Sequence, residues 1–397
     1  MADRLFIADE AEVRKGTTMD IYFERTKKIL EATGNDKVKV TAEFTSGGLP
    51  SGWPWAVFCG LEEVIRLMEG QPVDLYAIPE GTVFRARDSA SVRVPLMNVS
   101  GAYCDFGIFE TAMLGMICQP SGIATASARV KIAAEGKTVL AFGNRRMHPG
   151  IAGVLDRSCY IGGCDGVSSR FGAELTGTEA VGTVPHALML VMGSNEAAFK
   201  AFDEIIEPDV PRVMLIDTFE DERAAAVAAA KVIKDLKGVR LDTPSSRRGN
   251  FKELINEVRW ELDVNGYKDV SIIASGGLNE KTVAEIVHSA VSGFGVGTSI
   301  ANAPTLDIGM DIIEKEGRPI SKRGKFSGRK FPYRCPHCFA MAVSLSPDEH
   351  MKCADCGTPM EMIEVPVLKN GKRVQPQRSP SEIREYVLGQ VKDLKLR

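Results

Sequence analysis

The amino-acid sequence predicts an α/β protein whose central part is an irregular barrel of βα units. From about residue 137 onward, apolar segments with strand character alternate with helical patterns at intervals of roughly 25 to 30 residues, as successive βα units around a parallel sheet do. The residues before this region lack the repeat, and the composition changes near residue 321, ahead of four clustered cysteines. We therefore expect an N-terminal α+β domain at 1–115, the α/β barrel at 116–322, and a small C-terminal module with a charged tail at 323–397.

The first 115 residues predict one helix and several short strands. Helical spacing of apolar residues indicates a helix over 21–32, and strand-like segments occupy 38–44 and 74–78. Turns rich in Gly, Pro and Ser separate these elements. The segment therefore reads as an α+β arrangement without a repeating unit.

The repeat that follows contains seven candidate buried strands and intervening helices. The helix expected over 249–263 places its apolar residues on one face, and that over 220–236 has acids in its first turn and lysines in its last, which complements the helix dipole. About seven units favour an irregular or incomplete barrel over an open doubly wound sheet. The expected strands are 139–143, 161–165, 180–186, 212–218, 239–243, 270–276 and 294–298.

Composition excludes several classes of protein. Of the 397 residues, 44% are hydrophobic and 25% charged, which is ordinary for globular proteins and excludes disordered and fibrous chains. The net charge of −3 provides no basic field for nucleic acid or an anionic membrane. Because no segment approaches 18 uninterrupted apolar residues and no signal peptide precedes the chain, we expect an intracellular, cytoplasmic protein.

Two glycine-containing loops follow the last two expected strands. Residues 272–279 lead into a helix, and residues 294–299 follow the next strand. Glycines let backbone N–H groups approach an anion, and phosphate sites in βα barrels are often built from the loops after the last two strands. The alternative is that these glycines serve only tight turns, and the absence of G-x-G-x-x-G disfavours a dinucleotide. The expected phosphate-binding residues are Ser275, Gly276, Gly277, Gly295, Gly297 and Thr298.

Charged and imidazole side chains follow other expected strands. Asp217 and Asp242 end two of them, where carboxylates can hold Mg²⁺ or ribose hydroxyls, although they would also cap the following helices. Arg145 and Arg146 lie just past a strand and can grip phosphate or carboxylate oxygens. His186, which also ends an expected strand, is a candidate nucleophile or general base, against the alternative of a structural histidine.

The late cysteines form two C-x-x-C pairs separated by fourteen residues. This spacing is typical of four thiolates arranged tetrahedrally around Zn²⁺. A closed site of this kind has a structural role. A rubredoxin-type iron site and plain reduced thiols are the alternatives. The expected ligands are Cys335, Cys338, Cys353 and Cys356.

The chain resembles nicotinate phosphoribosyltransferase, and in particular the short archaeal-type members of that family that carry a C-terminal zinc knuckle. The resemblance covers almost the whole length. The segments that carry it are 20–26, 106–119 with Glu110-Thr111, 142–149, 160–169, 182–186, 239–250, 274–278 and 295–299.

The resemblance implies a type II phosphoribosyltransferase fold, in which an N-terminal open-faced α/β domain joins an irregular α/β barrel. It implies transfer of the ribosyl-5-phosphate of phosphoribosyl pyrophosphate, supplied with Mg²⁺, to nicotinate, in NAD biosynthesis. The glycine loops with Thr298 would then hold the 5′-phosphate, Arg145 the base carboxylate or pyrophosphate, and Asp242 with Arg240 the ribose and pyrophosphate. Phe142 and Arg146 are further expected substrate-binding residues.

Two further expectations come from the same resemblance. Tyr22 is similar to a tyrosine that stacks on the base across a dimer interface, which implies a homodimer or larger homo-oligomer with shared active sites. His186 matches a histidine that family members phosphorylate with ATP, which implies coupling of ATP hydrolysis to synthesis.

The sequence departs from longer family members and leaves alternatives open. Residues 242–246 replace a D-S-G-D-like loop, and Met147-His148-Pro149 follows the two arginines, so the pyrophosphate contacts differ. A relative acting on nicotinamide or quinolinate is one alternative; quinolinate, with two carboxylates, should require a denser set of cations. A zinc-ribbon nucleic-acid-binding protein is another, supported only by the basic flank 322–330.

Overall fold

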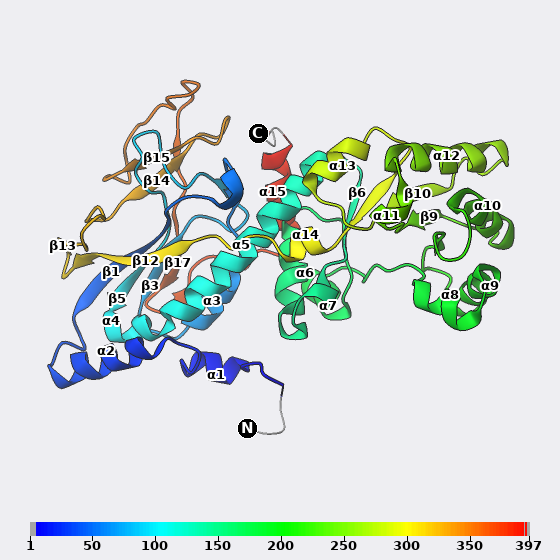
Figure 1. The fold of residues 1–397 in the computed structure, drawn as a ribbon. Coiled ribbons are helices and arrows are strands. Elements are labelled where there is room, and N and C mark those ends of the chain that lie inside the picture. The colour runs from blue at the N-terminus through cyan, green and yellow to red at the C-terminus, as the bar shows by residue number, and fades with distance from the viewer. Residues whose placement is uncertain (1–4, 393, 395–397) are drawn as a thin grey trace. The chain divides into compact units, whose positions relative to one another are not determined.

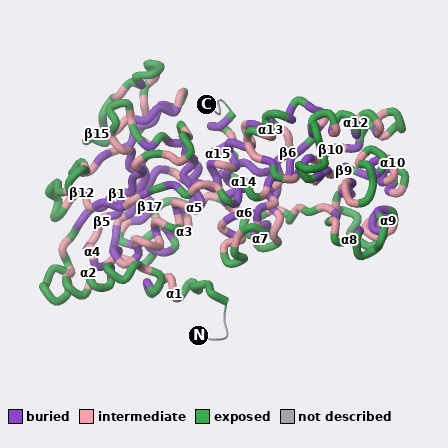
Figure 2. The backbone as a smooth tube through the Cα atoms, viewed as in Figure 1, coloured by how far each residue is buried: buried purple, intermediate pink, exposed green. Residues whose placement is uncertain are grey.

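The computed structural model describes residues 5–392 and residue 394. The described residues divide into two compact units, one comprising residues 5–125 and 304–390 and the other residues 126–303, 391, 392 and 394. Figure 1 shows the elements of each, and Figure 2 shows that the strands of both are largely buried. The long helix α5 (Glu110–Ala133) begins in the first unit and ends in the second.

A seven-stranded antiparallel sheet forms the centre of the first unit, in the order β13-β12-β1-β5-β3-β17-β18. On β1, Val40, Ala42 and Phe44 lie on one face and belong to the main hydrophobic core. Helix α3 adds a buried apolar face to this core, because its apolar residues recur at helical spacing. The strands are β13 (Arg318–Pro319), β12 (Ile308–Lys315), β1 (Lys39–Ser46), β5 (Pro95–Ala102), β3 (Asp74–Ala77), β17 (Val365–Lys369) and β18 (Lys372–Arg373).

Besides α5, the first unit also contains two smaller sheets and five α-helices among the described residues. A three-stranded sheet, in the order β15-β14-β16, leads into and out of the cysteine cluster, and a two-stranded sheet pairs β2 with β4. The helices are α1 (Glu10–Arg14), α2 (Ile21–Ala32), α3 (Leu61–Met68), α4 (Tyr103–Phe106) and α15 (Pro380–Val391), and the strands are β2 (Ala56–Val57), β4 (Val83–Phe84), β14 (Phe331–Arg334), β15 (Met341–Ser344) and β16 (Glu361–Met362).

A row of charged side chains crosses the other face of the seven-stranded sheet. Glu43 on β1 lies in register with Asp311 on β12, and both are buried. The segment that follows β13 supplies the opposite charges: Lys322 and Lys325 pair with Asp311, and Lys330 lies 2.9 Å from Glu43. The lysines of the basic flank noted in the sequence therefore form ion pairs within the protein.

A six-stranded parallel sheet forms the centre of the second unit, in the order β7-β6-β11-β10-β9-β8. Within the described chain no strand pairing joins its two edges, β7 and β8. The curled sheet is therefore an incomplete barrel. This confirms the predicted fold class. Its strands are β6 (Thr138–Ala141), β7 (Gly166–Val167), β8 (Val213–Leu215), β9 (Gly238–Leu241), β10 (Ser271–Ala274) and β11 (Gly293–Val296).

Helices follow the strands, as the alternating pattern predicts. The helix expected over 249–263 is α12, and the alanine-rich one expected over 220–236 is α10. None of the helices in the described residues is long and apolar enough to span a bilayer. The helices are α6 (Ala152–Ile161), α7 (Arg170–Thr176), α8 (His186–Met192), α9 (Asn195–Ile205), α10 (Glu222–Val232), α11 (Ser245–Arg248), α12 (Phe251–Val264), α13 (Glu280–Ile286) and α14 (Thr298–Ala301).

Two of the seven expected strands differ from the structure. Residues 161–165 end helix α6 and form a turn, and the strand begins later, at Gly166. In the segment 180–186 only Ala180 makes a bridge, to Val167, because Gly182 and Pro185 interrupt strand pairing. His186 therefore does not end a strand; it is the first residue of helix α8.

The compact units also differ from the expected division at 115 and 322. Strand β12 pairs with β1, and β17 pairs with β3. These long-range pairings place residues 304–390 with the N-terminal residues in one unit, so the C-terminal module shares a sheet with the N-terminal domain.

Candidate active site

The carboxyl ends of the parallel strands gather most of the candidate residues of the second unit. In a parallel sheet these ends share one rim, where βα proteins place their active sites. Asp217 follows β8, Asp242 follows β9, Ser275 follows β10 and Gly297 follows β11. Hydrogen bonds join these loops to one another, so the candidate residues lie close together at one rim.

Arg240 is the centre of a hydrogen-bond network at this rim. Its Nε donates to Ser275 Oγ at 2.9 Å, its Nη1 to Thr183 Oγ1 at 2.8 Å, and its Nη2 to Asp242 Oδ2 at 2.9 Å. Its guanidinium carbon also lies 5.2 Å from the centre of the Phe142 ring. A planar guanidinium with five donors can satisfy all these partners and retain two N–H groups. Arg240 therefore fixes the carboxylate of Asp242 and keeps donors for a ligand.

His186 lies between the two acids. Its Nε2 is 3.6 Å from Asp217 Oδ2 and 3.9 Å from Asp242 Oδ2, and its Nδ1 is 2.9 Å from Thr218 Oγ1. The imidazole is 38% exposed, so a ligand can reach it. One nitrogen is held by a hydroxyl while the other faces carboxylates, an arrangement that orients the ring for proton or phosphoryl chemistry.

Asp217 is the most buried acid of the site. Its side chain is 2% exposed, and its Oδ2 has no hydrogen-bond partner among the described residues. Burial raises the pKa of Asp217, an effect opposed by His186. A buried carboxylate with an unpartnered oxygen costs stability, and a group of this kind at the rim is a candidate functional residue.

The two glycine loops present free backbone donors. Gly276 and Gly277 have φ angles of +89° and +69°, which residues with side chains rarely adopt. In the described structure the N–H groups of residues 276–278 and 297–299 donate to no protein acceptor. Ser299 Oγ donates to the carbonyl of Leu278 at 2.7 Å and so ties the loops together. This arrangement suits an anion such as phosphate.

Gly295 has a different role from the other glycines. It lies within β11 and is buried, and a Cβ there would lie 2.4 Å from the Phe142 ring. Its lack of a side chain makes room for the ring on which Arg240 stacks. Gly295 thus lies in the strand beneath the loop, and its expected contact with the 5′-phosphate stays a prediction.

The two candidate arginines lie in a turn just after β6. Arg146 Nε donates to Thr298 Oγ1 at 3.3 Å, which brings this turn to the loop after β11. Arg145 is exposed and makes no ion pair or hydrogen bond within the described part of the chain. Arg145 is therefore available to a bound anion, as is Arg247, an exposed residue of the short helix α11 after β9.

Sequence reasoning missed several polar residues of the rim. Thr183 and Thr218 hold Arg240 and His186, and Arg248 Nη1 donates to the carbonyl of Gly276 at 2.8 Å. In the sequence, the only sign of a role at the rim is that Thr183 lies close to His186, Thr218 follows Asp217, and Arg248 lies a few residues after Asp242. Their partners are distant in sequence, so the pattern did not reveal the contacts.

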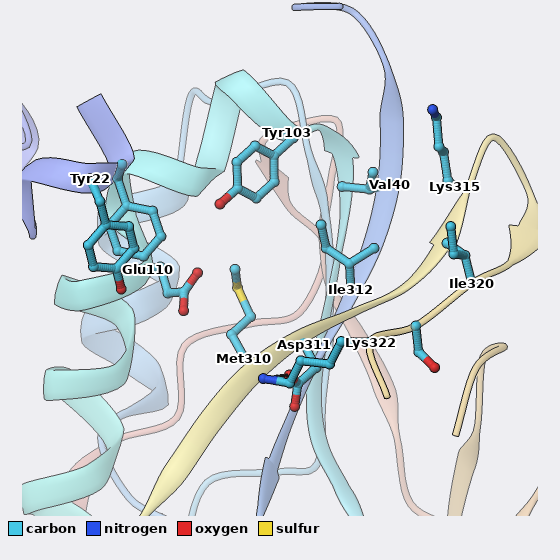
Figure 3. Close-up of a pocket in the computed structure, with 12 residues that line it drawn as sticks. Tyr22, Val40, Tyr103, Glu110, Met310, Asp311, Ile312, Lys315, Ile320 and Lys322 are labelled. Carbon is cyan, nitrogen blue, oxygen red and sulfur yellow. Dashed lines mark ion pairs between the residues drawn. The ribbon is translucent and has the colours of Figure 1, made fainter. Parts of the chain in front are cut away.

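Tyr22, the remaining candidate, lies in the first unit. It is on helix α2, its side chain is exposed, and its ring packs on that of Phe23 with a centroid distance of 4.2 Å. It lines a cavity of about 560 Å³, drawn in Figure 3. An exposed aromatic ring beside a cavity is available for stacking.

The four predicted cysteines come together in the first unit. Their sulfur atoms all lie within 4.8 Å of one another, with Cys335–Cys356 at 3.5 Å and Cys338–Cys353 at 3.4 Å. Four thiolates about 2.3 Å from a tetrahedral zinc lie about 3.8 Å apart, so the cluster fits a metal ion. None of the nine cysteines forms a disulfide.

Comparison with known families gives a consistent match across the chain. Residues 123–311 match the family described as quinolinate phosphoribosyl transferase, C-terminal domain, and residues 20–121 match its N-terminal domain. A nicotinate phosphoribosyltransferase of Mycobacterium tuberculosis is 30% identical over 341 residues, covering 81% of this chain and 68% of that protein.

Solved structures match nearly the full length. A nicotinate-nucleotide pyrophosphorylase from Pyrococcus furiosus is 50% identical, with a TM-score of 0.93 over 99% of this chain and 100% of that one. Human nicotinic acid phosphoribosyltransferase has the same fold, with a TM-score of 0.73, 18% identity and coverage of 95% and 94%.

The buried acid gives a first prediction. Because the folded pKa of Asp217 is raised, its ionisation opposes folding. This cost is absent below the unfolded pKa of about 4, grows as pH rises above that value, and is complete above the folded pKa. Asp217→Asn should therefore raise the melting temperature at pH 7–8, but not at pH 4, and lower turnover at least roughly tenfold. Calorimetry at both pH values checks the first point.

Asp221→Asn is the matched control. A side-chain hydrogen bond from Arg223 lowers the pKa of Asp221, so its replacement should destabilise at neutral pH and leave turnover unchanged. A D217N protein that is less stable than wild type at pH 8 would contradict the analysis.

The cysteine cluster gives a second prediction. Purified protein should contain one metal ion per chain, and Cys353→Ser should lose it and lower the melting temperature by several degrees, because metal binding contributes directly to folding. Elemental analysis and calorimetry check this. Cys118→Ser, outside the cluster, should retain the metal, and an unchanged metal content in C353S would reject the site.

Proposed function

The chain belongs to the nicotinate phosphoribosyltransferase family, and from this premise we propose how its rim residues carry out the reaction. The protein is a phosphoribosyltransferase that joins nicotinate to the ribosyl-5-phosphate of phosphoribosyl pyrophosphate. The products are nicotinate mononucleotide, an intermediate of NAD biosynthesis, and pyrophosphate. The single observation that carries the site assignment is the Arg240 network with the unpartnered backbone donors beside it.

The chemistry requires stabilisation more than a covalent nucleophile. The nicotinate ring nitrogen forms a bond to C1′ of the ribose while the bond from C1′ to the pyrophosphate oxygen breaks, and the bonding electrons leave with pyrophosphate. The transition state has oxocarbenium character, so the protein must align the nitrogen and stabilise departing negative charge. The substrate enters as its magnesium complex.

Each part of the rim has a role in this scheme. Gly276 and Gly277 with Gly297 and Thr298 would bind the 5′-phosphate through the free backbone N–H groups. Asp242, held by Arg240, would bind the ribose hydroxyls. The oxygens of Asp217 and Asp242 are hard donors of the kind that Mg²⁺ prefers.

Nicotinate is favoured over the two alternative pyridines. Arg240, Arg146 and Arg248 already donate to protein atoms, and Arg145 is the free guanidinium beside the loop after β11. Arg145 at this position suits the single carboxylate of nicotinate, and the 30% identical Mycobacterium tuberculosis relative is named for nicotinate.

We further propose that ATP phosphorylates His186. A proton on Nδ1 shared with Thr218 leaves the Nε2 lone pair to attack the γ-phosphorus, forming an N–P bond as the bond to ADP breaks. Partial exposure of the ring supports access by the nucleotide. Hydrolysis of the phosphohistidine would then favour synthesis.

Assembly and metal content complete the proposal. Tyr22 lies in the first unit and is exposed, which supports stacking on the base bound by another copy in a homodimer. The metal at the cysteine cluster is assigned as zinc, because four thiolates favour it over harder cations, and it would stabilise the fold. Free cysteines throughout the described chain support a reducing, cytoplasmic location.

The direct test is product formation. Purified protein incubated with Mg²⁺, phosphoribosyl pyrophosphate and one pyridine at a time should form product with nicotinate and little with nicotinamide or quinolinate, as resolved by liquid chromatography. Decarboxylating turnover of quinolinate as the main activity would overturn the assignment. In the same assay ATP should stimulate the wild type, whereas His186→Ala should give equal rates with and without ATP.

Arg145→Ala tests the anion contact. Loss of a charge-assisted hydrogen bond of about 1.5–3 kcal/mol should lower kcat/KM roughly ten- to a hundredfold without changing the melting temperature. Lys231→Ala, which removes an exposed cation at the last turn of α10, is the control and should be active. Wild-type kinetics in R145A would remove this residue from the site.

A further inference from the structure

The cavity beside Tyr22 contains an acid to which no function has been assigned. Its volume of about 560 Å³ is in the range of small-molecule sites. Its walls come from helices α2, α4 and α5 and from strand β12 with the segment after β13, all within the first unit (Figure 3). The polar residues among those lining it are Tyr22, Tyr103, Glu110, Asp311, Lys315, Ser321 and Lys322.

A polar anchor fixes the start of helix α2 to the start of helix α5. Thr111 Oγ1 donates to Asp20 Oδ2 at 2.8 Å and accepts from the Asp20 N–H at 3.1 Å. Asp20 is the N-cap of α2, but its side chain makes no capping hydrogen bond to that helix. The residue is therefore used to hold the two helix starts together, and this places Tyr22 near Glu110.

Glu110 has an unusual environment at this junction. It is the first residue of α5, and its carboxyl makes no hydrogen bond or ion pair among the described residues. Burial, with smaller effects of the Asp311 and Asp20 charges, raises the pKa of Glu110 to about 7, against the opposing effect of Lys322. The acid therefore changes charge in the physiological range.

The groups that face Glu110 leave the Tyr22 and Tyr103 hydroxyls as its candidate partners, and Tyr22 is the more exposed of the two. Asp311 is bound by Lys322 and Lys325, and Asp20 by Thr111. The Tyr22 and Tyr103 hydroxyls have no hydrogen-bond partner in the described chain, and Lys315 is exposed at the end of β12. The Glu110 charge contributes to a raised pKa at both tyrosines. Figure 3 shows the Tyr22 hydroxyl and the Glu110 carboxyl extending toward the same cavity.

We propose that Glu110 is a positioning residue for Tyr22. The ionised Glu110 carboxylate accepts a hydrogen bond from the Tyr22 hydroxyl and thereby holds the Tyr22 ring in place. The proposal rests on the proposed function in that Tyr22 contacts the pyridine base. Above neutral pH the carboxylate accepts from the hydroxyl, and such charge-assisted bonds are roughly twice as strong as neutral ones. Below it, the proton taken up by Glu110 weakens this bond and frees the ring.

Two measurements test the proposal separately. In protein labelled with 3-fluorotyrosine, the ¹⁹F resonance of Tyr22, assigned with Tyr22→Phe, should shift with a midpoint near pH 7. In steady-state assays KM for nicotinate should fall about three- to tenfold from pH 6 to pH 8, beyond any change in kcat.

Glu110→Gln should abolish both pH dependences, fixing KM near its low-pH value with kcat nearly unchanged. Glu110→Asp should restore part of the dependence. Glu24→Gln, an exposed acid on the same helix α2, is the matched control and should behave like wild type. If E110Q does not fold, Thr111→Val, which releases the anchor, should raise KM at all pH values.

The outcomes separate this inference from the function itself. An E110Q protein that retains the Tyr22 shift, or a Tyr22 shift without any change in KM, overturns the positioning role. Absence of turnover with nicotinate in every variant and in wild type overturns the proposed function, while the ¹⁹F titration still decides whether Glu110 controls Tyr22.

Discussion

The parallel pairing of six strands is the constraint on which the site of this protein depends. Because neighbouring strands run in the same direction, strand ends that are 22 or more positions apart in sequence meet at one rim. Arg240 converts this proximity into a rigid arrangement, since its guanidinium binds the loops that follow three different strands or helices. Asp242 is oriented by that network, and the Phe142 ring supports it from a fourth loop, over the space that Gly295 leaves. The catalytic geometry is therefore a property of the sheet and not of any one segment.

Charge balance explains how the long C-terminal part is joined to the N-terminal sheet. The segment 322–330 has the composition of a nucleic-acid-binding flank, and that was the only support for a nucleic-acid-binding function. Its lysines instead neutralise Asp311 and Glu43 on the buried face of the sheet, and Arg329 pairs with Glu364 at 2.7 Å. A buried acid left without these partners would cost several kcal/mol. Four of the five basic residues of this segment therefore contribute to the folding energetics of the first unit through ion pairs.

Two buried carboxylates show how this fold trades stability for function. Burial raises the pKa of Asp217 and of Glu110, so each acid opposes folding when ionised. Neither is neutralised by a lysine or arginine salt bridge in the described residues, in contrast to Asp311, whose two lysines lower its pKa against the effect of burial. Groups that cost stability and lie beside a ligand-accessible surface are those that catalysis and binding use.

The sequence by itself determined the chemistry of this protein, because that information is local. The glycine loops, the acids that follow strands, Arg145 and the two C-x-x-C pairs are recognisable from neighbouring residues, and the alternation of strands and helices predicted the barrel. Tertiary structure alone decided which partners these residues have. The three-way binding of Arg240, the helical start at His186 and the pairing of β12 with β1, which joins Val40 to Lys315, depend on contacts between distant segments. The local sequence does not predict such contacts, because they stabilise the fold only after the chain has closed the loops between the distant segments.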